Sequence, residues 1–234
     1  MKWPLPKPKV TEQSPRLFQN DLVEMLSRTS PGVVVAIYLP TALGLLWYSV
    51  ARGGVPVPTT VLVAAVGAAA WTLTEYWLHR AIMHWVPNNG WGARMHFWIH
   101  GIHHEWPKDP YRLVMPPSVS LVLFFLFLAL WTAVFGRSGW AFHGGFTLGY
   151  LAYDLSHYFY HHRKPEREWL VRLQRHHLRH HFHPRYEERN FAITVPWWDR
   201  IFGTATPAEP SGPVPGAARA RSSAAEPGLR AGER

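Results

Sequence analysis

The chain has 234 residues, 47% of them hydrophobic, and its 13 tryptophans far exceed the usage of an average soluble domain. It has no cysteine, which excludes structural disulfides, thiolate zinc sites and iron–sulfur clusters, so any metal must bind His, Asp or Glu. The formal charge of +9 comes with no nucleic-acid-binding motif, so no nucleic acid partner is expected.

The N-terminal segment, residues 1–32, predicts one short amphipathic helix over residues 15–28. Leu17, Leu22, Met25 and Leu26 recur near helical spacing behind a cap position at Ser14. Such a helix can lie on the protein surface or on a membrane surface, and the residues favour neither. The first apolar run begins only near residue 33, so no cleaved signal peptide is expected.

Four apolar runs follow, and a helix needs ~20 residues to cross a bilayer. They occupy residues 33–50, 55–78, 119–135 and 140–153. Glycines and His143 lower the hydropathy of the fourth run, so a re-entrant segment is the alternative there. Residues 33–205 are therefore expected to form one all-α integral membrane domain with about four transmembrane helices. Residues 206–234 lack aromatics and are expected to be a disordered tail.

The basic residues predict the topology. All 24 Lys and Arg except Arg52 and Arg137 lie in the N-terminal segment, in the 79–118 loop or after residue 156. The positive-inside rule places these segments in the cytoplasm, together with every histidine except His143. We therefore expect a multi-pass protein whose His-rich helical cap faces the cytoplasm. The bias toward Ala, Arg and Pro suggests a bacterial cytoplasmic membrane.

Ten histidines fall into four clusters, and their spacing indicates a metal site. The clusters are His79 and His84 in HRAIMH, His100, His103 and His104 in HGIHH, His157 and His161 in HYFYH, and His177, His180 and His181 in HLRHH. Residues at i, i+3 and i+4 share a helix face, and neutral imidazole binds iron, zinc and copper. The i, i+5 pair His79 and His84 cannot share a face of a regular helix, so the second span is expected to fray or bulge there. Ten ligands exceed the needs of one ion, so two neighbouring metals are predicted.

Other polar residues are assigned lesser roles. Glu75 and Asp154 lie near His79 and His157 and are candidates to orient these ligands by accepting a ring N–H. The alternative for Glu75 is that it caps polar backbone or interacts with Arg80. Structural roles are expected for the isolated histidines, which are His96, His143, His162, His176 and His183. A metal transporter would need histidines along a path across the membrane, and the clusters provide none.

In this order the clusters resemble the motifs of the fatty acid hydroxylase, sterol desaturase and carotene hydroxylase superfamily. These motifs are His-x3-4-His, His-x2-His-His, His-x3-His and His-x2-His-His. Over about residues 70–205, the segments HGIHHEWPKDPYRLVMPP, YDLSHYFYHH, HHLRHHFHP and NFAITVPWWDRIFGT are similar to fatty acid 2-hydroxylases. The resemblance implies that the ten histidines hold a dimetal centre, with iron in catalysis and zinc possible in preparations.

The resemblance also implies a reaction, in which O2 and two electrons hydroxylate C2 of a fatty acyl chain at the membrane. Many eukaryotic members carry an N-terminal cytochrome b5 domain. This chain has no room for one, so a separate cytochrome b5-like protein or ferredoxin is the expected donor. The alternative substrates are a sterol, a carotenoid or an alkyl lipid. Tyr111 and Arg112 could position the substrate head group or anchor the chain at the membrane interface, and Trp197 and Trp198 are interpreted as interface anchors.

Overall fold

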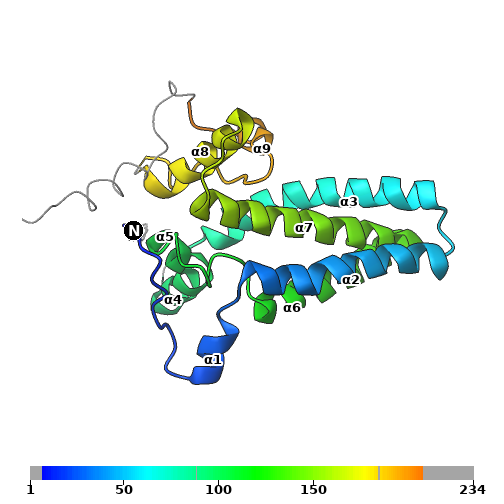
Figure 1. The fold of residues 1–234 in the computed structure, drawn as a ribbon, viewed down its shortest axis with the longest axis horizontal. Coiled ribbons are helices and arrows are strands. Elements are labelled where there is room, and N and C mark those ends of the chain that lie inside the picture. Colours follow the sequence, from blue (N-terminus) through cyan, green and yellow to red (C-terminus); the bar gives the residue numbers. More distant parts are fainter. Residues whose placement is uncertain (1–6, 88, 184, 208–234) are drawn as a thin grey trace, which may run out of the picture.

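The computed structural model describes residues 7–87, 89–183 and 185–207, and it contains no strand in these ranges (Figure 1). The predicted tail lies almost wholly in residues 208–234, outside the described residues. In chain order, the elements are α1 (Asp21–Leu26), α2 (Pro31–Ala51), α3 (Val57–Trp77), the π-helix η1 (Leu78–Met83), α4 (Gly90–His96), the π-helix η2 (Phe97–Gly101), α5 (Ile102–Glu105), α6 (Pro117–Phe135), the 3-10 turn η3 (Gly136–Ser138), α7 (Gly139–His162), α8 (Glu168–Phe182) and α9 (Trp197–Ile201).

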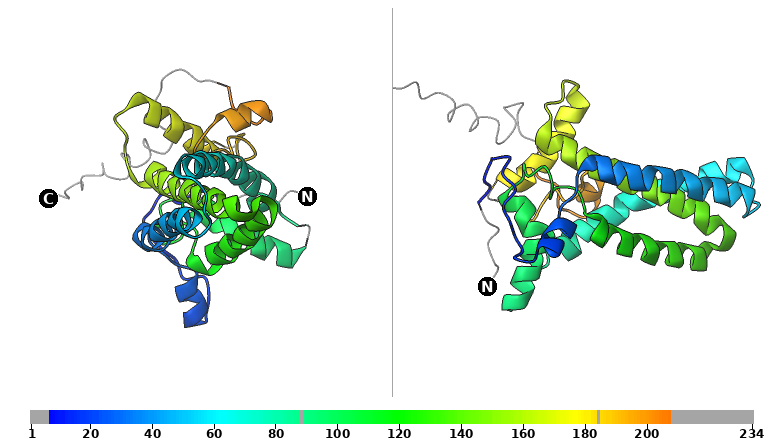
Figure 2. Two further views of the ribbon diagram at one scale, coloured as in Figure 1. Left: turned by 90° about the vertical axis from the view of Figure 1, so that its right-hand side faces the viewer. Right: turned by 60° about the horizontal axis from the view of Figure 1, so that its bottom comes forward.

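Four long helices, α2, α3, α6 and α7, pack side by side and form the body of the molecule (Figures 1 and 2). Three helical stretches are long and apolar enough to cross a membrane: Pro31–Ala51, Val57–Met83 and Pro117–His162. The third has 46 residues because only η3 separates α6 from α7. The all-α membrane fold is therefore confirmed, whereas the number of four crossings stays a prediction.

Helix α7 contains the fourth predicted run, which has the weakest apolar signal, and this helix lies at the centre of the bundle. It packs against α2, α3 and α6, and buried residues occur along its whole length. A Cβ atom on Gly145 would lie 1.8 Å from the carbonyl oxygen of Ala64 in α3, and one on Gly67 would lie 2.1 Å from that of Phe142. Only glycine permits such close backbones. The residues that weaken the apolar signal are thus those that let α7 occupy the centre.

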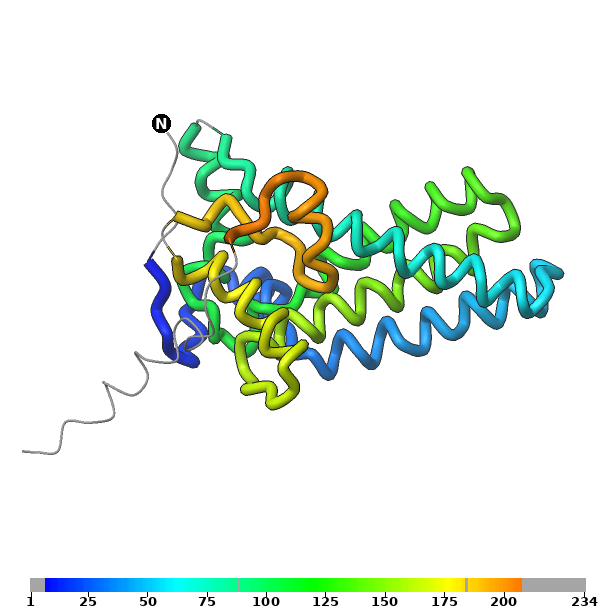
Figure 3. The backbone as a smooth tube through the Cα atoms, turned by 90° about the horizontal axis from the view of Figure 1, so that it is seen from above, coloured from blue at the N-terminus to red at the C-terminus, as the bar shows by residue number. Residues whose placement is uncertain are grey.

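The shorter helices form a cap at one end of the bundle, beyond the histidine-bearing ends of α3 and α7 (Figure 3). The C-terminal part of the cap is held on the end of α3. Tyr76 stacks on Phe202 with ring centroids 5.0 Å apart, and Trp198 Nε1 donates to Thr72 Oγ1 over 3.0 Å. Trp198 thus packs against α3, whereas Trp197, with 59% of its surface exposed, stays available as an interface anchor.

The N-terminal helix is shorter than predicted, spanning Asp21–Leu26 instead of residues 15–28. Asn20 is its cap, because its side chain accepts from the N–H groups of residues 22 and 23. Ser14, the predicted cap, instead donates its hydroxyl to Asp109 over 2.8 Å. Leu22 and Met25 of α1 are 59% and 62% exposed, which favours the membrane-surface interpretation of this helix.

Candidate metal centre

The ten clustered histidines come together as two adjacent groups of five. Group one is His79, His84, His100, His104 and His180, and group two is His103, His157, His161, His177 and His181. Within each group, the candidate ligand nitrogens all lie within 4.8 Å of one another. The rings of His104 and His181 stack with centroids 4.2 Å apart, so the two groups are neighbours. This arrangement suits two adjacent metal ions.

The i, i+5 pair lies at a π-helix, so of the two predicted alternatives, fraying and a bulge, the structure shows the bulge. Helix α3 passes into η1, and the N–H of His84 donates to the carbonyl of His79 over 3.1 Å, an i to i+5 hydrogen bond. The wider turn brings both imidazoles to group one. A second π-helix, η2, carries His100. Local widening of the helix therefore places ligand candidates at two positions.

Each His-x2-His-His motif divides its three residues between the groups. His100 and His104, one helical turn apart, belong to group one, whereas His103 belongs to group two. In α8 the division is reversed, since His177 and His181 belong to group two and His180 belongs to group one. Each motif thus supplies both groups, which fixes them side by side.

The donor set fits metal ions. The Nε2 atoms of His79, His84 and His104 lie 3.0, 3.1 and 2.9 Å from Nε2 of His100. A neutral imidazole has one N–H and one lone pair, so four converging nitrogens cannot all be satisfied by hydrogen bonds among themselves. His180 Nε2 is buried and has no hydrogen-bond partner among the described residues. A cation among these nitrogens would accept the lone pairs that protons leave unused.

The electrostatics keep these imidazoles neutral. Burial, and to a smaller extent neighbouring imidazoles, lowers the pKa of the candidates outside the predicted spans well below its ordinary value. These are His84, His100, His103, His104, His177, His180 and His181. Neutral imidazole is the form that binds a metal, so the site is prepared for metal near neutral pH.

Backbone carbonyls, not carboxylates, hold two of the candidate ligands. His79 Nδ1 lies 2.6 Å from the carbonyl oxygen of Phe191, and His180 Nδ1 lies 2.8 Å from that of Arg189. Glu75 therefore does not accept from His79. Its carboxylate accepts from the N–H groups of residues 193 and 194 and from Thr194 Oγ1, over 2.7–3.2 Å. The structure thus shows the alternative role, in which Glu75 caps polar backbone. By doing so, Glu75 anchors the segment whose Phe191 carbonyl holds His79.

Asp154 also differs from its predicted role. It accepts from the N–H of Met115 over 3.3 Å and from Tyr150 Oη over 3.2 Å, and neither ring nitrogen of His157 has a hydrogen-bond partner among the described residues. The carboxylate thus ties the loop before α6 to α7. Its orienting role toward His157 is not present in this structure.

The five isolated histidines lie outside both groups, as expected. One of them leads to a residue that the sequence analysis missed, since His176 Nε2 lies 2.9 Å from Asp199 Oδ2. Asp199 is fully buried and accepts from the N–H groups of Phe191 and Ala192 over 2.8 and 3.0 Å. It therefore fixes the segment whose carbonyl receives His79. In the sequence, Asp199 stands out only as the single acidic residue of the segment PWWDRIFGT.

A cavity of about 400 Å³ adjoins both groups. His100 of group one and His103 and His157 of group two reach its wall. The remaining wall is mostly apolar and includes Leu17 and Phe18 of the N-terminal segment. A mostly apolar pocket with a few convergent polar groups is typical of a small-molecule site. The N-terminal segment is therefore part of this pocket.

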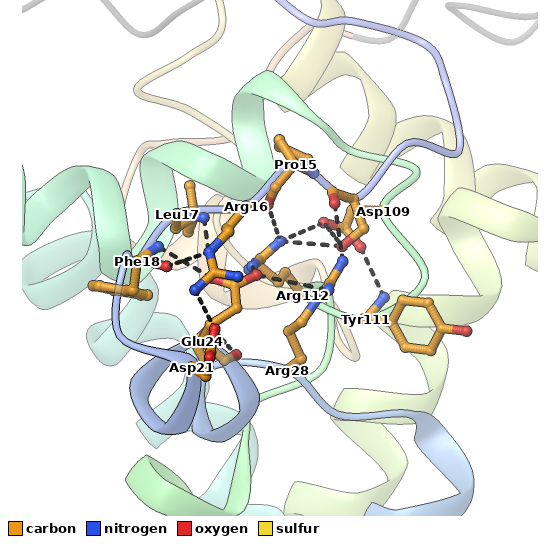
Figure 4. Close-up of polar contacts among 12 residues, drawn as sticks. Pro15, Arg16, Leu17, Phe18, Asp21, Glu24, Arg28, Asp109, Tyr111 and Arg112 are labelled. Carbon is orange, nitrogen blue, oxygen red and sulfur yellow. Dashed lines mark hydrogen bonds and ion pairs between the residues drawn. The ribbon is translucent and has the colours of Figure 1, made fainter.

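Arg112 lines the cavity, but its guanidinium is already engaged (Figure 4). It forms ion pairs with Glu24 and Asp109, and only 3% of its side chain is exposed. It also donates to the carbonyl of Pro15 over 2.6 Å. Arg112 thus fastens residues 14–28 over the cavity, and the structure does not support its predicted contact with a substrate head group. We call residues 14–28 the N-terminal strap.

The fold and the site define a helical membrane protein with a candidate two-metal centre made of histidine. A family model described as fatty acid hydroxylase matches residues 64–204, so the chain belongs to the fatty acid hydroxylase family. It is 39% identical to the dihydroceramide fatty acyl 2-hydroxylase FAH1 of Arabidopsis thaliana, over 85% of this chain and 83% of that protein. It is 35% identical to the fatty acid 2-hydroxylase of Homo sapiens, over 83% and 58%. The hydroxylase domain in the solved structure of full-length scs7p matches with a TM-score of 0.75 and 34% identity, over 82% and 72% of the two chains.

Proposed function

We propose that this protein is a membrane-bound monooxygenase that hydroxylates a fatty acyl lipid at C2. Two of the relatives named above, from Arabidopsis thaliana and Homo sapiens, are a dihydroceramide fatty acyl 2-hydroxylase and a fatty acid 2-hydroxylase, which supports both the substrate class and the position. One atom of O2 enters the C–H bond and the other leaves as water, which consumes two electrons and two protons. Bound metal ions supply the oxygen activation, a chemistry that amino-acid side chains lack.

The observation that carries the proposal is the cavity beside the two histidine groups. Its apolar wall suits an acyl chain, and His100, His103 and His157 bring both groups to the same space. An acyl chain along this wall would be held with one carbon beside the histidines, and the apolar wall would exclude water. Position-specific attack then depends on where the polar end of the lipid stops.

The finer assignments are part of the same proposal. Each group of five histidines holds one iron ion, and zinc, which imidazole also binds, is expected as a substitute in purified protein. The electrons come from a separate carrier, either a cytochrome b5-like protein or a ferredoxin. The cap faces the cytoplasm, where the basic residues gather, and the bacterial cytoplasmic membrane is the proposed location.

The test compares the wild type with the double variant His103→Ala/His180→Ala, which removes one candidate ligand from each group. Both are expressed in a membrane host with an electron donor, and 2-hydroxy fatty acids are measured by mass spectrometry in hydrolysed lipids. We expect product from the wild type and from the control His183→Ala, and none from the double variant. Iron-loaded wild type that yields no 2-hydroxy acid with a competent donor would favour a sterol or carotenoid substrate instead.

A further inference from the structure

A groove lies on the outer side of the cap, along α8 and α9, and its lining is strongly basic. Its volume is about 730 Å³. Its charged lining consists of one acid, Glu168, and four arginines, which are Arg172, Arg175, Arg179 and Arg200. Arg172 and Arg200 are exposed, and Glu168 faces Arg172 in a 3.4 Å pair whose partners are both exposed to solvent. A pair of this kind contributes little, and the described lining residues carry four guanidinium groups against one carboxylate, which is a net positive formal charge. We call it the arginine groove.

The arginine groove adjoins the candidate metal centre along α8, where Arg179 of its lining directly precedes His180 of group one. His176 lines the groove, and the next residue in the chain is His177, a buried member of group two. His176 also reaches group one through three hydrogen bonds. They run from His176 to Asp199, from Asp199 to the N–H of Phe191, and from the Phe191 carbonyl to His79, over 2.9, 2.8 and 2.6 Å. A partner protein bound in the groove would therefore be connected to both histidine groups by short covalent and hydrogen-bonded paths.

We propose that the arginine groove is the docking site of the electron donor, a small one-electron carrier protein with an acidic face. This inference rests on the proposed function, which needs two electrons for each O2. Each docked carrier gives up one electron and is oxidised by one unit, so two dockings balance one hydroxylation. Complementary charge would steer the carrier to the groove and make its association fall as salt is added.

The surroundings of the groove favour a protein over other occupants. Trp169 lines an adjoining hollow and is 51% exposed, and Arg and Trp are among the residues most enriched where proteins bind one another. Residues 208–234 carry four Arg and three Glu, so they bring no net negative charge to a basic groove. Among the described residues, none lines both the arginine groove and the acyl cavity, so a docked carrier leaves the substrate site clear.

The test measures binding directly, with the iron-loaded full chain in detergent. The probes are the soluble haem domain of a cytochrome b5 and a plant-type ferredoxin, both acidic. The variant Arg172→Glu/Arg200→Glu reverses two groove charges, and Arg94→Glu/Arg185→Glu makes the same charge change at exposed sites outside the groove. We expect one probe to bind the wild type and the control alike, with affinity falling as salt rises. The groove variant should bind at least ~10-fold more weakly, because charge reversal across an interface costs about 1.4 kcal/mol or more.

Two further readouts separate this inference from the proposed function. Turnover driven by the carrier, relative to turnover driven by a reduced small-molecule mediator, should fall in the groove variant while iron content and melting temperature stay unchanged. If the groove variant loses carrier binding but no variant forms product, docking stands and the proposed reaction fails. Equal binding of carrier by both double variants, or no binding by the wild type, overturns the docking proposal. The binding is repeated with the chain reconstituted in vesicles with and without phosphatidylglycerol. A loss confined to vesicles that contain this lipid also overturns the proposal, because the groove would then be a membrane contact.

Discussion

At the scale of single residues, the candidate ligands are buried imidazoles that folding keeps uncharged. In the unfolded chain each titrates near its ordinary pKa of 6.5, whereas burial lowers the folded pKa. The unfolded state therefore binds more protons below pH 6.5, and the stability of metal-free protein should be fully present above that pH and decline below it. Metal competes with protons for the same nitrogens, so loaded protein should melt higher and lose its metal over the same acidic range.

This expectation is checked with chelator-treated and iron-loaded protein in detergent, by measuring melting temperature and metal content on both sides of pH 6.5. The control is the metal-free variant His183→Ala. In the wild type the His183 ring stacks on Tyr186 outside both groups, so the substitution should leave the pH dependence unchanged. Metal-free protein that becomes more stable on acidification would contradict the assignment of the buried histidines as neutral.

Sequence spacing could predict the ten histidines but not the groups that hold their second nitrogens. The i, i+4 and i, i+5 patterns depend only on the order of the side chains, so they can be read from the sequence alone. The partners of His79 and His180 are backbone carbonyls of Phe191 and Arg189, and every residue has a carbonyl. Proximity to a carboxylate in sequence suggested Glu75, which folding instead uses to cap residues 193 and 194. Only the tertiary structure distinguishes these possibilities.

At the scale of elements, the N-terminal strap depends on a buried ion pair. Replacing Glu24 with Gln leaves Asp109 as the remaining acidic partner of Arg112 among the described residues, and we expect the strap to loosen by about 2 kcal/mol, roughly 30-fold in local opening. Because Leu17 and Phe18 line the acyl cavity, KM should rise more than kcat falls. Hydrogen exchange over residues 17–28 measures the opening, and substrate titration measures KM.

The matched control is Asp21→Asn, which removes the exposed ion pair with Arg16 on the same strap and should change exchange little. Burial raises the pKa of Glu24, but hydrogen bonds from Leu17 and Phe18 and the pair with Arg112 lower it overall below 4.5. The contribution of Glu24 is thus present above pH 4.5 and lost as the pH falls further, so the wild type and Glu24→Gln should converge in acid. Equal hydrogen exchange in Glu24→Gln and Asp21→Asn near neutral pH would show that the strap does not depend on the pair between Glu24 and Arg112.

The central position of α7 depends on its glycines. A methyl group at Gly145 would meet the carbonyl of Ala64, so Gly145→Ala must push α7 away from α3. We expect a loss of about 3 kcal/mol, the upper range for overpacking. In α2, a Cβ at Gly44 meets nothing within 4 Å, and Gly44→Ala should be neutral or stabilising. Equal melting temperatures for the two variants in detergent would show that α3 and α7 are not in backbone contact.

The element boundaries show where sequence patterns have limited resolving power. The apolar runs predicted the long helices because their length and composition are local properties. The predicted N-terminal helix begins too early, because Leu17 fits the helical spacing of Leu22, Met25 and Leu26. The N–H groups of Leu17 and Phe18 instead donate to the Glu24 carboxylate, a contact that requires the chain to fold back on itself. Apolar spacing cannot distinguish a helix face from a cavity wall.

At the scale of the whole molecule, the separation of charge predicts the orientation of the cap. Because the chain has no cysteine, single cysteines can report topology without a background. Arg137 lies in the turn between α6 and α7, and Arg167 lies at the start of α8, and both are exposed. We expect an impermeant thiol reagent to label Arg137→Cys in intact cells, and Arg167→Cys only after permeabilisation, because the basic segments remain inside.

The labelling pattern also constrains the source of electrons. A cap in the cytoplasm gives the arginine groove access to soluble reduced carriers. Labelling of Arg167→Cys from outside would place both histidine groups on the opposite face, away from cytoplasmic carriers. Labelling of both sites from outside would mean that α6 and α7 do not both cross, as a re-entrant fourth segment would require. The topology experiment therefore tests the number of crossings and the route of electron supply together.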